Sequence, residues 1–278
     1  MLDLDFSTSQ SAVRWLAAHA LPVFGVVLAL LLLGVASVWQ LVQRYGVHHE
    51  KSRLRPPVYL LIYLAAGFAL VVGAAALFAE VAENVGDGSK LGQLDLLFSN
   101  TLQASVSLPT LEVFAAITHL GDPLVLGILC VATGLALLWQ QHFLLCAAWV
   151  LATGGNALLN PTLKTIFARA RPLHEHGLAA ASGYSFPSGH SSGSVVVYGM
   201  LAYVLARLLS ARWSAARLPI VLVAAVIAYA VGSSRVFLQV HFASDVLAGF
   251  ASGAAWLAVC IGTFEVLRYR SQGRLASS

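Results

Sequence analysis

Long apolar runs separated by short polar loops make up most of the chain. A membrane-spanning helix needs about 20 consecutive apolar residues, and several runs have this character. Each is bounded by charged residues, proline or glycine, as is typical of helix ends at a membrane interface. The pattern predicts an all-α polytopic membrane bundle of about six to seven spans, with candidates at residues 21–43, 58–82, 123–140, 143–160, 191–210, 218–234 and 246–268.

Two segments need separate interpretation. The run at 21–43 follows a leader with a single basic residue, Arg14, whereas a secretory signal needs a basic leader. We therefore expect this run to be a span.

Residues 83–122 carry leucine and phenylalanine at helical spacing around Asp95. This spacing predicts an interfacial helix, and it fits a helix packed on the bundle equally well.

The composition agrees with a membrane protein. Of 278 residues, 59% are hydrophobic and only 10% are charged, which leaves too few polar side chains to cover a soluble domain. The formal net charge of +4 is diffuse and predicts no nucleic-acid partner. Cys130, Cys146 and Cys260 lie in apolar runs, so they indicate neither a disulfide framework nor a zinc site.

Basic residues are distributed unevenly between the loops. Ten of the 16 fall between the first two spans, between the fifth and sixth, or after the last. The positive-inside rule places these loops and the C-terminus in the cytoplasm. The other six fall on the outer face, where Lys164, Arg169, Arg171 and Arg235 gather in two places. This exception indicates that these four cations serve something other than topology.

The first polar cluster of the outer face is KTIFARARP, residues 164–172. Lys164 and Arg171 are seven residues apart, which is two helical turns, so they would share one face about 10 Å apart. This spacing suits two cations that bind one ligand. Cations snorkelling at a helix end would give the same pattern.

The second cluster is PSGH, residues 187–190, directly before an apolar run. Ser188 is a natural N-cap, and Gly189 would let the backbone approach a ligand closely. His190 would lie in the first turn of the span, where free amide hydrogens and the helix dipole favour an anion. A Ser-Gly turn before a helix is also a common structural feature.

The third cluster is SRVFLQVHFASD, residues 234–245. Arg235 ends one run, and His241 and Asp245 are four residues apart at the start of the next, so the carboxylate can reach the imidazole. Such an aspartate fixes the tautomer and leaves the other ring nitrogen as a nucleophile. A structural His–Asp pair is the alternative, but ionisable residues at membrane depth are usually functional.

Together the clusters place three cations on one side of the membrane, from Lys164, Arg171 and Arg235. Nearby carboxylates are too few to neutralise them, so they favour a multiply charged oxyanion such as phosphate. At this point the ordered motifs K-x6-R-P, P-S-G-H and S-R-x5-H-x3-D resemble the type 2 phosphatidic acid phosphatase superfamily, which also contains vanadium haloperoxidases and bacterial acid phosphatases. The resemblance implies a phosphatase membrane domain over 58–270, preceded at 1–57 by an additional transmembrane helix and a cytoplasmic basic loop.

The resemblance also implies roles for individual residues. It implies that His241 attacks phosphorus and becomes a phosphohistidine, that Asp245 holds its ring, and that His190 protonates the leaving oxygen. It implies that the phosphate oxygens are bound by Lys164, Arg171, Ser188, Gly189 and Arg235. It implies no metal and no other cofactor, because three fixed cations can replace magnesium in phosphoryl transfer.

These expectations combine into a function. We expect an integral-membrane lipid phosphate phosphatase of the bacterial inner membrane, with its site on the periplasmic face. Undecaprenyl pyrophosphate, phosphatidic acid and phosphatidylglycerol phosphate all fit, and undecaprenyl pyrophosphate or a broad range is favoured because that carrier is recycled on the outer face. A lipid phosphotransferase using the same phosphohistidine and a non-catalytic anion-binding membrane protein are the alternatives.

Overall fold

The computed structural model describes residues 6–46, 56–86, 88–172, 177–179 and 181–275. Over these residues the chain forms helices and loops, with no strand. Seven helical segments are long and apolar enough to cross a membrane, which confirms the predicted all-α membrane bundle. The predicted spans correspond to α2 (Ala20–Gly46), α3 (Pro56–Asn84), α6 (Pro123–Trp139), α7 (Phe143–Phe167), α8 (Gly189–Leu208), α9 (Arg217–Phe237) and α10 (Ala243–Leu275).

The N-terminal unit predicted at 1–57 is described only in part. Its helix is α2, whereas Lys51, Arg53 and Arg55 of the predicted basic loop lie outside the described residues. A helix that the sequence pattern did not predict, α1 (Phe6–Ala18), precedes α2 and buries Ala17. The sequence pattern indicates only a leader here, because these residues contain no long apolar run.

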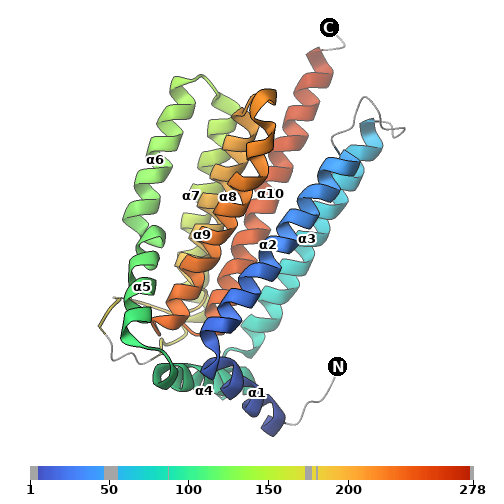
Figure 1. The fold of residues 1–278 in the computed structure, drawn as a ribbon. Coiled ribbons are helices and arrows are strands. Elements are labelled where there is room, and N and C mark those ends of the chain that lie inside the picture. The colour runs from blue at the N-terminus through green and yellow to red at the C-terminus, as the bar shows by residue number, and fades with distance from the viewer. Residues whose placement is uncertain (1–5, 47–55, 87, 173–176, 180, 276–278) are drawn as a thin grey trace.

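Helices α1 and α4 (Lys90–Ser105) lie across one end of the bundle, while the long helices run side by side (Figure 1). Helix α4 packs on α1, α3 and α10, so the helix expected within 83–122 covers the bundle end. The remainder of that segment forms α5 (Leu108–Thr118) and the short turn η1 (His119–Gly121). Both continue towards α6, and Leu108–Trp139 forms one apolar segment.

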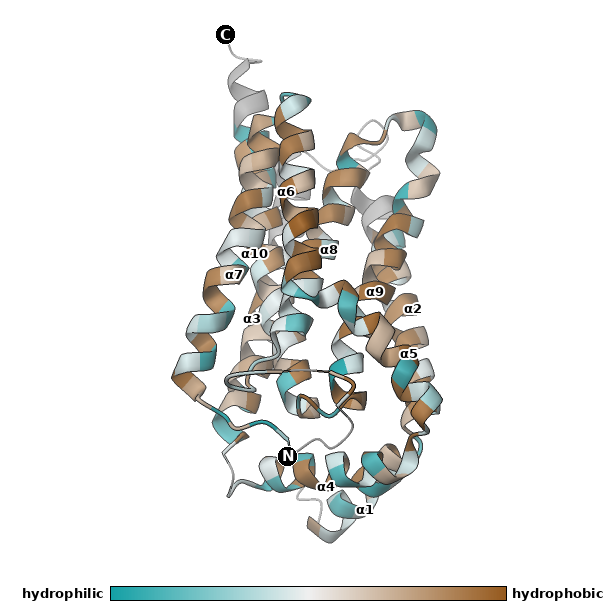
Figure 2. Ribbon diagram, turned by 90° about the vertical axis from the view of Figure 1, so that its left-hand side faces the viewer, coloured by the Kyte–Doolittle hydropathy of each residue, from teal (hydrophilic) through white to brown (hydrophobic). Residues whose placement is uncertain are grey.

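The long helices consist mostly of hydrophobic residues, and hydrophilic residues are more frequent at the end with α1 and α4 (Figure 2). Large residues such as Leu124 and Leu158 are 74% and 76% exposed, as expected where hydrocarbon is the solvent. Inside, Trp149 packs among α6, α7, α8 and α10, and its indole donates to the Cys130 carbonyl at 3.0 Å. The three cysteines are free thiols.

Close packing of α10 against α8 brings the second and third polar clusters together. A Cβ at Gly249 would lie 2.6 Å from the Ser188 carbonyl oxygen, and one at Gly253 would lie 2.9 Å from that of Ser192. Both distances are too short for a side chain, so the absence of a Cβ lets the two backbones touch. The first turns of α8 and α10 therefore lie against each other.

Candidate active site

The eight predicted site residues lie at or next to the ends of α7 and α9 and the starts of α8 and α10. Figure 1 shows these helix ends at the bundle end where α1 and α4 lie. Helices α7 and α9 end there, whereas α8 and α10 begin there, because successive spans run in opposite directions. Lys164 lies in the last turn of α7 and Arg235 in the last turn of α9. Ser188 caps α8, and Asp245 lies in the first turn of α10.

His241 and Asp245 form a buried pair, with 3% and 0% exposure. The sequence predicts His241 at the start of the last helix. In the structure α10 begins at Ala243, so the ring of His241 lies in the loop before the helix. Its Nδ1 is 3.5 Å from Asp245 Oδ2. The same oxygen accepts from the Phe242 amide at 2.9 Å and from the Ser185 hydroxyl, which is also 3.4 Å from His241 Nδ1.

The opposite ring nitrogen faces a cation. Arg171 Nη1 lies 3.1 Å from His241 Nε2, and a guanidinium can only donate, so Nε2 is the unprotonated nitrogen of this tautomer. Burial lowers the pKa of His241 to about 3, and the charges of Arg171 and Lys164 act in the same direction, against Asp245. The ring is therefore neutral at ordinary pH, with a lone pair on Nε2.

Arg171 and Lys164 are held by backbone carbonyls rather than by carboxylates. Both donate to the Tyr184 carbonyl, Lys164 Nζ at 2.6 Å and Arg171 Nη2 at 3.1 Å. Arg171 also donates to the carbonyls of Ser182, Gly183 and Val240. Burial lowers the pKa of Arg171, and Asp245 opposes that shift. These contacts fix the cations in place and leave their charge available to a ligand.

Arg235 is the third predicted cation, and it is only 3% exposed. Its Nη1 donates to the Thr118 hydroxyl at 2.7 Å, but its buried Nε has no partner. It interacts electrostatically with Arg171 and with His190, so it belongs to the same cluster. Within the described residues, neither Arg235, Arg171 nor Lys164 has a carboxylate within 4.0 Å. A buried donor without a partner, beside cations that no carboxylate contacts, suits an anion.

The N-terminus of α8 is built as a tight cap. The Ser188 oxygen accepts from the Ser191 amide at 3.4 Å and from the Ser191 hydroxyl at 2.9 Å. The Ser188 amide donates to the Asp245 carbonyl at 2.9 Å, which ties α8 to α10. A Cβ at Gly189 would lie 3.0 Å from Asn160 Oδ1, so a larger residue would crowd α7. The Ser188 hydroxyl thus serves the helix cap in this state.

His190 has a carboxylate partner that the sequence did not indicate. Its Nε2 is 3.1 Å from Asp122 Oδ1, and the other Asp122 oxygen is 2.7 Å from His119 Nδ1. Asp122 lies 68 positions from His190, immediately before Pro123 at the start of α6. Its position before an apolar run at the outer face was the only sequence signal. Each proposed catalytic histidine is therefore next to a carboxylate.

Three further residues complete the surroundings of Asp245. Ser185 donates to it, as described above. Arg169, which the sequence grouped with the outer cations without a role, lies between Asp245 and Asp95 of α4. In the sequence, Asp95 is only an acidic residue within a leucine-rich segment. Neighbouring residues in the chain gave no sign of these contacts, because the partners lie 74 and 76 positions apart.

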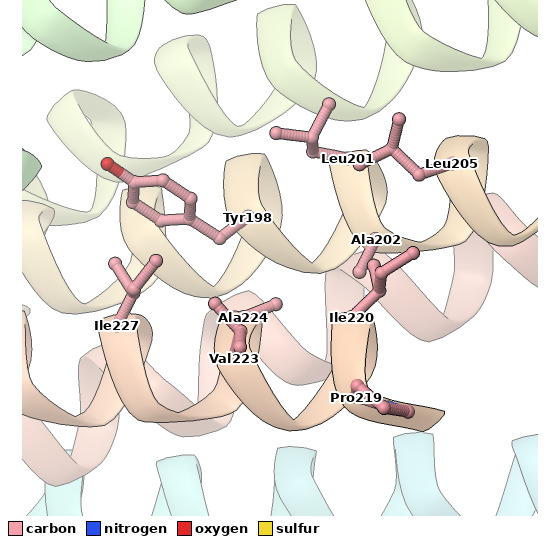
Figure 3. A pocket seen from close by; sticks show the side chains of 9 residues that line it. All are labelled: Tyr198, Leu201, Ala202, Leu205, Pro219, Ile220, Val223, Ala224 and Ile227. Carbon is pink, nitrogen blue, oxygen red and sulfur yellow. The ribbon is translucent and has the colours of Figure 1, made fainter. Parts of the chain in front are cut away.

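An apolar pocket of about 280 Å³ lies between α8 and α9. Figure 3 shows side chains from both helices facing one another, with the Tyr198 hydroxyl as the polar group among them. That hydroxyl donates to the Leu120 carbonyl at 2.7 Å. The pocket can accept hydrocarbon but offers nothing to bind phosphate, so it is not the site of chemistry.

The polar cluster does not have the composition of a metal site. Among the described residues, no three His, Cys, Asp or Glu side chains come together in a group that could hold a metal ion. Asp95 and Asp245 are both contacted by Arg169. Lys164, Arg171 and Arg235 are the cations that lie in this cluster.

The chain is similar to known membrane phosphatases. A family model described as PAP2 superfamily matches residues 143–268, which include all three motifs. Phosphatidylglycerophosphatase B of Bacillus subtilis (strain 168) is 39% identical over 147 residues, which is 51% of this chain and 69% of that protein. The crystal structure of a transmembrane PAP2 type phosphatidylglycerolphosphate phosphatase from Bacillus subtilis superposes with a TM-score of 0.65 at 32% identity, covering 70% of this chain and 96% of that one.

Proposed function

This chain belongs to the PAP2 superfamily, and we propose that it is an integral-membrane phosphatase that removes a phosphate or pyrophosphate headgroup from a lipid. One observation carries the proposal. The unprotonated Nε2 of His241 faces Arg171, while Nδ1 is directed to Asp245, at the polar end of an apolar bundle. This is the arrangement of a nucleophile oriented from behind and surrounded by cations.

The proposed reaction has two steps. His241 Nε2 attacks phosphorus, the nitrogen–phosphorus bond forms, and the bond to the lipid oxygen breaks as His190 gives that oxygen a proton. A water molecule then attacks the phosphohistidine and loses a proton to His190, which releases phosphate and restores both rings. Asp245 stabilises the positive charge that develops on the His241 ring during the first step.

The three cations supply the charge stabilisation. Phosphoryl transfer depends mainly on positioning and on neutralising the oxygens of the transferred group. Lys164, Arg171 and Arg235 are not in contact with any carboxylate of the described residues, and a phosphate oxygen would take over the Arg171 donor that faces His241 Nε2. The unpartnered Nε of Arg235 is another free donor. We propose that these groups act without a divalent metal, with Ser188 and the Gly189 amide completing the phosphate site.

The name of the Bacillus relative makes phosphatidylglycerol phosphate the first substrate to test. Phosphatidic acid and undecaprenyl pyrophosphate carry a terminal phosphate on an apolar tail and remain candidates. Each places its phosphate in the headgroup layer and its tail in hydrocarbon, which suits a site at the end of apolar helices. Their shared chemistry defines the proposed class.

We expect the protein, purified in detergent, to release inorganic phosphate from at least one of these three lipids. Release should persist in excess chelator, because the cations are side chains, and vanadate should inhibit as a phosphate mimic. The measurement is phosphate release across the lipid panel with and without chelator. Transfer to an acceptor lipid without phosphate release would favour a phosphotransferase, and a complete loss in chelator would contradict the metal-free mechanism.

We further propose that the site opens on the periplasmic face of the inner membrane and that the C-terminus is cytoplasmic. Arg207, Arg212 and Arg217 lie at the bundle end opposite the site, as the positive-inside rule requires for this orientation. In intact cells, a membrane-impermeant thiol reagent should label Asn100→Cys, exposed on α4, and should reach Gln140→Cys, exposed at the opposite end, only after permeabilisation. The reverse labelling pattern would invert the proposed topology.

A further inference from the structure

The guanidinium of Arg169 joins two carboxylates in the interior. Its Nη1 donates to Asp245 Oδ1 at 2.6 Å and to the Ser244 hydroxyl at 2.8 Å, and its Nη2 donates to Asp95 Oδ2 at 2.9 Å. The side chains of Arg169, Asp95 and Asp245 are 5%, 4% and 0% exposed. Arg169 therefore links α4 to the carboxylate that faces His241.

The two oxygens of Asp245 have separate partners. Oδ1 accepts from Arg169, whereas Oδ2 accepts from the Phe242 amide and the Ser185 hydroxyl and faces His241 Nδ1. A carboxylate held by donors on both oxygens cannot rotate without breaking a charge-assisted hydrogen bond. The direction in which Oδ2 points is thus fixed from the side away from the imidazole.

Asp95 also binds the start of α10 directly, through Ser244. Ser244, in the first turn of α10, donates to Asp95 from its amide at 3.3 Å and from its hydroxyl. Amides in a first helical turn have no partner within the helix, so Asp95 satisfies one that would otherwise be buried and free. On the other side of His241, the side-chain Nε2 of Gln239 donates to the Ser99 carbonyl of α4 at 2.5 Å. Helix α4 therefore contacts the chain both before and after His241.

We propose that Asp95 and Arg169 are positioning residues that hold Asp245, and through it the ring of His241, in the orientation for attack on phosphorus. The inference rests on the proposed function, because it takes His241 as the nucleophile. Neither residue belongs to a motif position of the three clusters, and Asp95 lies outside the residues 143–268 that match the family. In this chain, α4 is thus part of the catalytic apparatus as well as a cover for the bundle end.

The first arm of the test is kinetic. Asp95→Asn and Arg169→Lys should each lower kcat by about 10-fold or more, the usual scale for a residue that orients a functional group from behind. KM should change little, because neither side chain touches substrate. Lysine keeps the charge at 169 but cannot donate in two fixed directions. Glu112→Gln, an exposed carboxylate on α5, is the matched control and should be unchanged.

A double-mutant comparison separates positioning from general destabilisation. If Asp95 acts through Asp245, adding Asp95→Asn to an Asp245→Asn protein should cause no further loss of kcat. Equal losses in both backgrounds would overturn the inference. If Asp95→Asn fails to insert, Ser244→Ala removes the hydroxyl that contacts both Asp95 and Arg169 and should lower kcat a few-fold. An unchanged kcat in Ser244→Ala would count against the inference.

The second arm does not depend on turnover. In protein labelled with ¹⁵N-histidine, the His241 signals are identified by their absence in His241→Ala. Asp95→Asn and Arg169→Lys should shift these signals, and Glu112→Gln should not. Unshifted His241 signals would overturn the positioning role whatever the activity. Shifted signals in a protein that releases no phosphate from any lipid would uphold the positioning role and refute the proposed function instead.

Discussion

Replacing His241 with alanine is expected to abolish phosphate release, with kcat falling by at least about 10⁴-fold, as when the nucleophile of a catalytic triad is removed. The reason is chemical: His241 Nε2 is contacted by the Arg171 guanidinium while the Asp245 carboxylate faces Nδ1 of the same ring, so the alanine variant loses the proposed nucleophile. The variant should still bind the substrate phosphate through Lys164, Arg171 and Arg235. The measurement is single-turnover phosphate release by detergent-purified protein that elutes as a folded species.

The same variant tests the covalent step. With a ³²P-labelled lipid phosphate, the unmodified protein should carry an acid-labile, alkali-stable label after rapid quenching, and His241→Ala should carry none. His142→Ala is the matched control, because His142 is exposed at the end of the bundle away from the site. A label retained in His241→Ala would place the nucleophile elsewhere. If the His241→Ala protein kept the label but released no phosphate, His241 would act only in the second step, the hydrolysis of the phosphorylated enzyme.

The transmembrane architecture could be predicted because the bilayer sets the length of a span. Each of the seven predicted runs lies largely within one of the seven candidate spans. The third span begins at Leu108 rather than at residue 123, because α5 and η1, which the sequence assigned to the interfacial segment, continue into α6. Helix α1 was not predicted, because its stability comes from packing on α4 rather than from its own composition. The orientation of α4 across the bundle end could not be predicted either, since the amphipathic spacing fits an interfacial helix and a helix packed on the bundle equally well.

The site residues carried by motifs could be predicted, but their partners could not. Residue type and spacing within a motif are local, so Lys164, Arg171 and His241 were identified from the sequence and lie together in the structure. Asp122 and Asp95 act across 68 and 74 positions, where a single sequence holds no pairing information. Replacing His241, His190, Asp95 and Arg169 tests the chemical roles predicted for this site.

Replacing His190 with alanine should lower kcat for a lipid substrate by about 10²- to 10⁴-fold, the range expected when a general acid is removed. A lipid alkoxide is a poor leaving group and needs a proton as its bond to phosphorus breaks. The loss should therefore depend on the leaving group. With p-nitrophenyl phosphate, whose nitrophenolate leaves without protonation, the first step should proceed in His190→Ala.

The second step should then fail, because His190 is also the proposed base for the attacking water. We expect a burst of about one nitrophenolate per active site followed by slow turnover, with phosphohistidine accumulating on His241. His19→Ala, an exposed histidine at the same end of the bundle, should show ordinary turnover without accumulation. If His190→Ala formed phosphohistidine as rapidly from the lipid as from the nitrophenyl ester, protonation of the leaving oxygen would have to come from another group. Asp122, 3.1 Å from His190, would then be the residue to test.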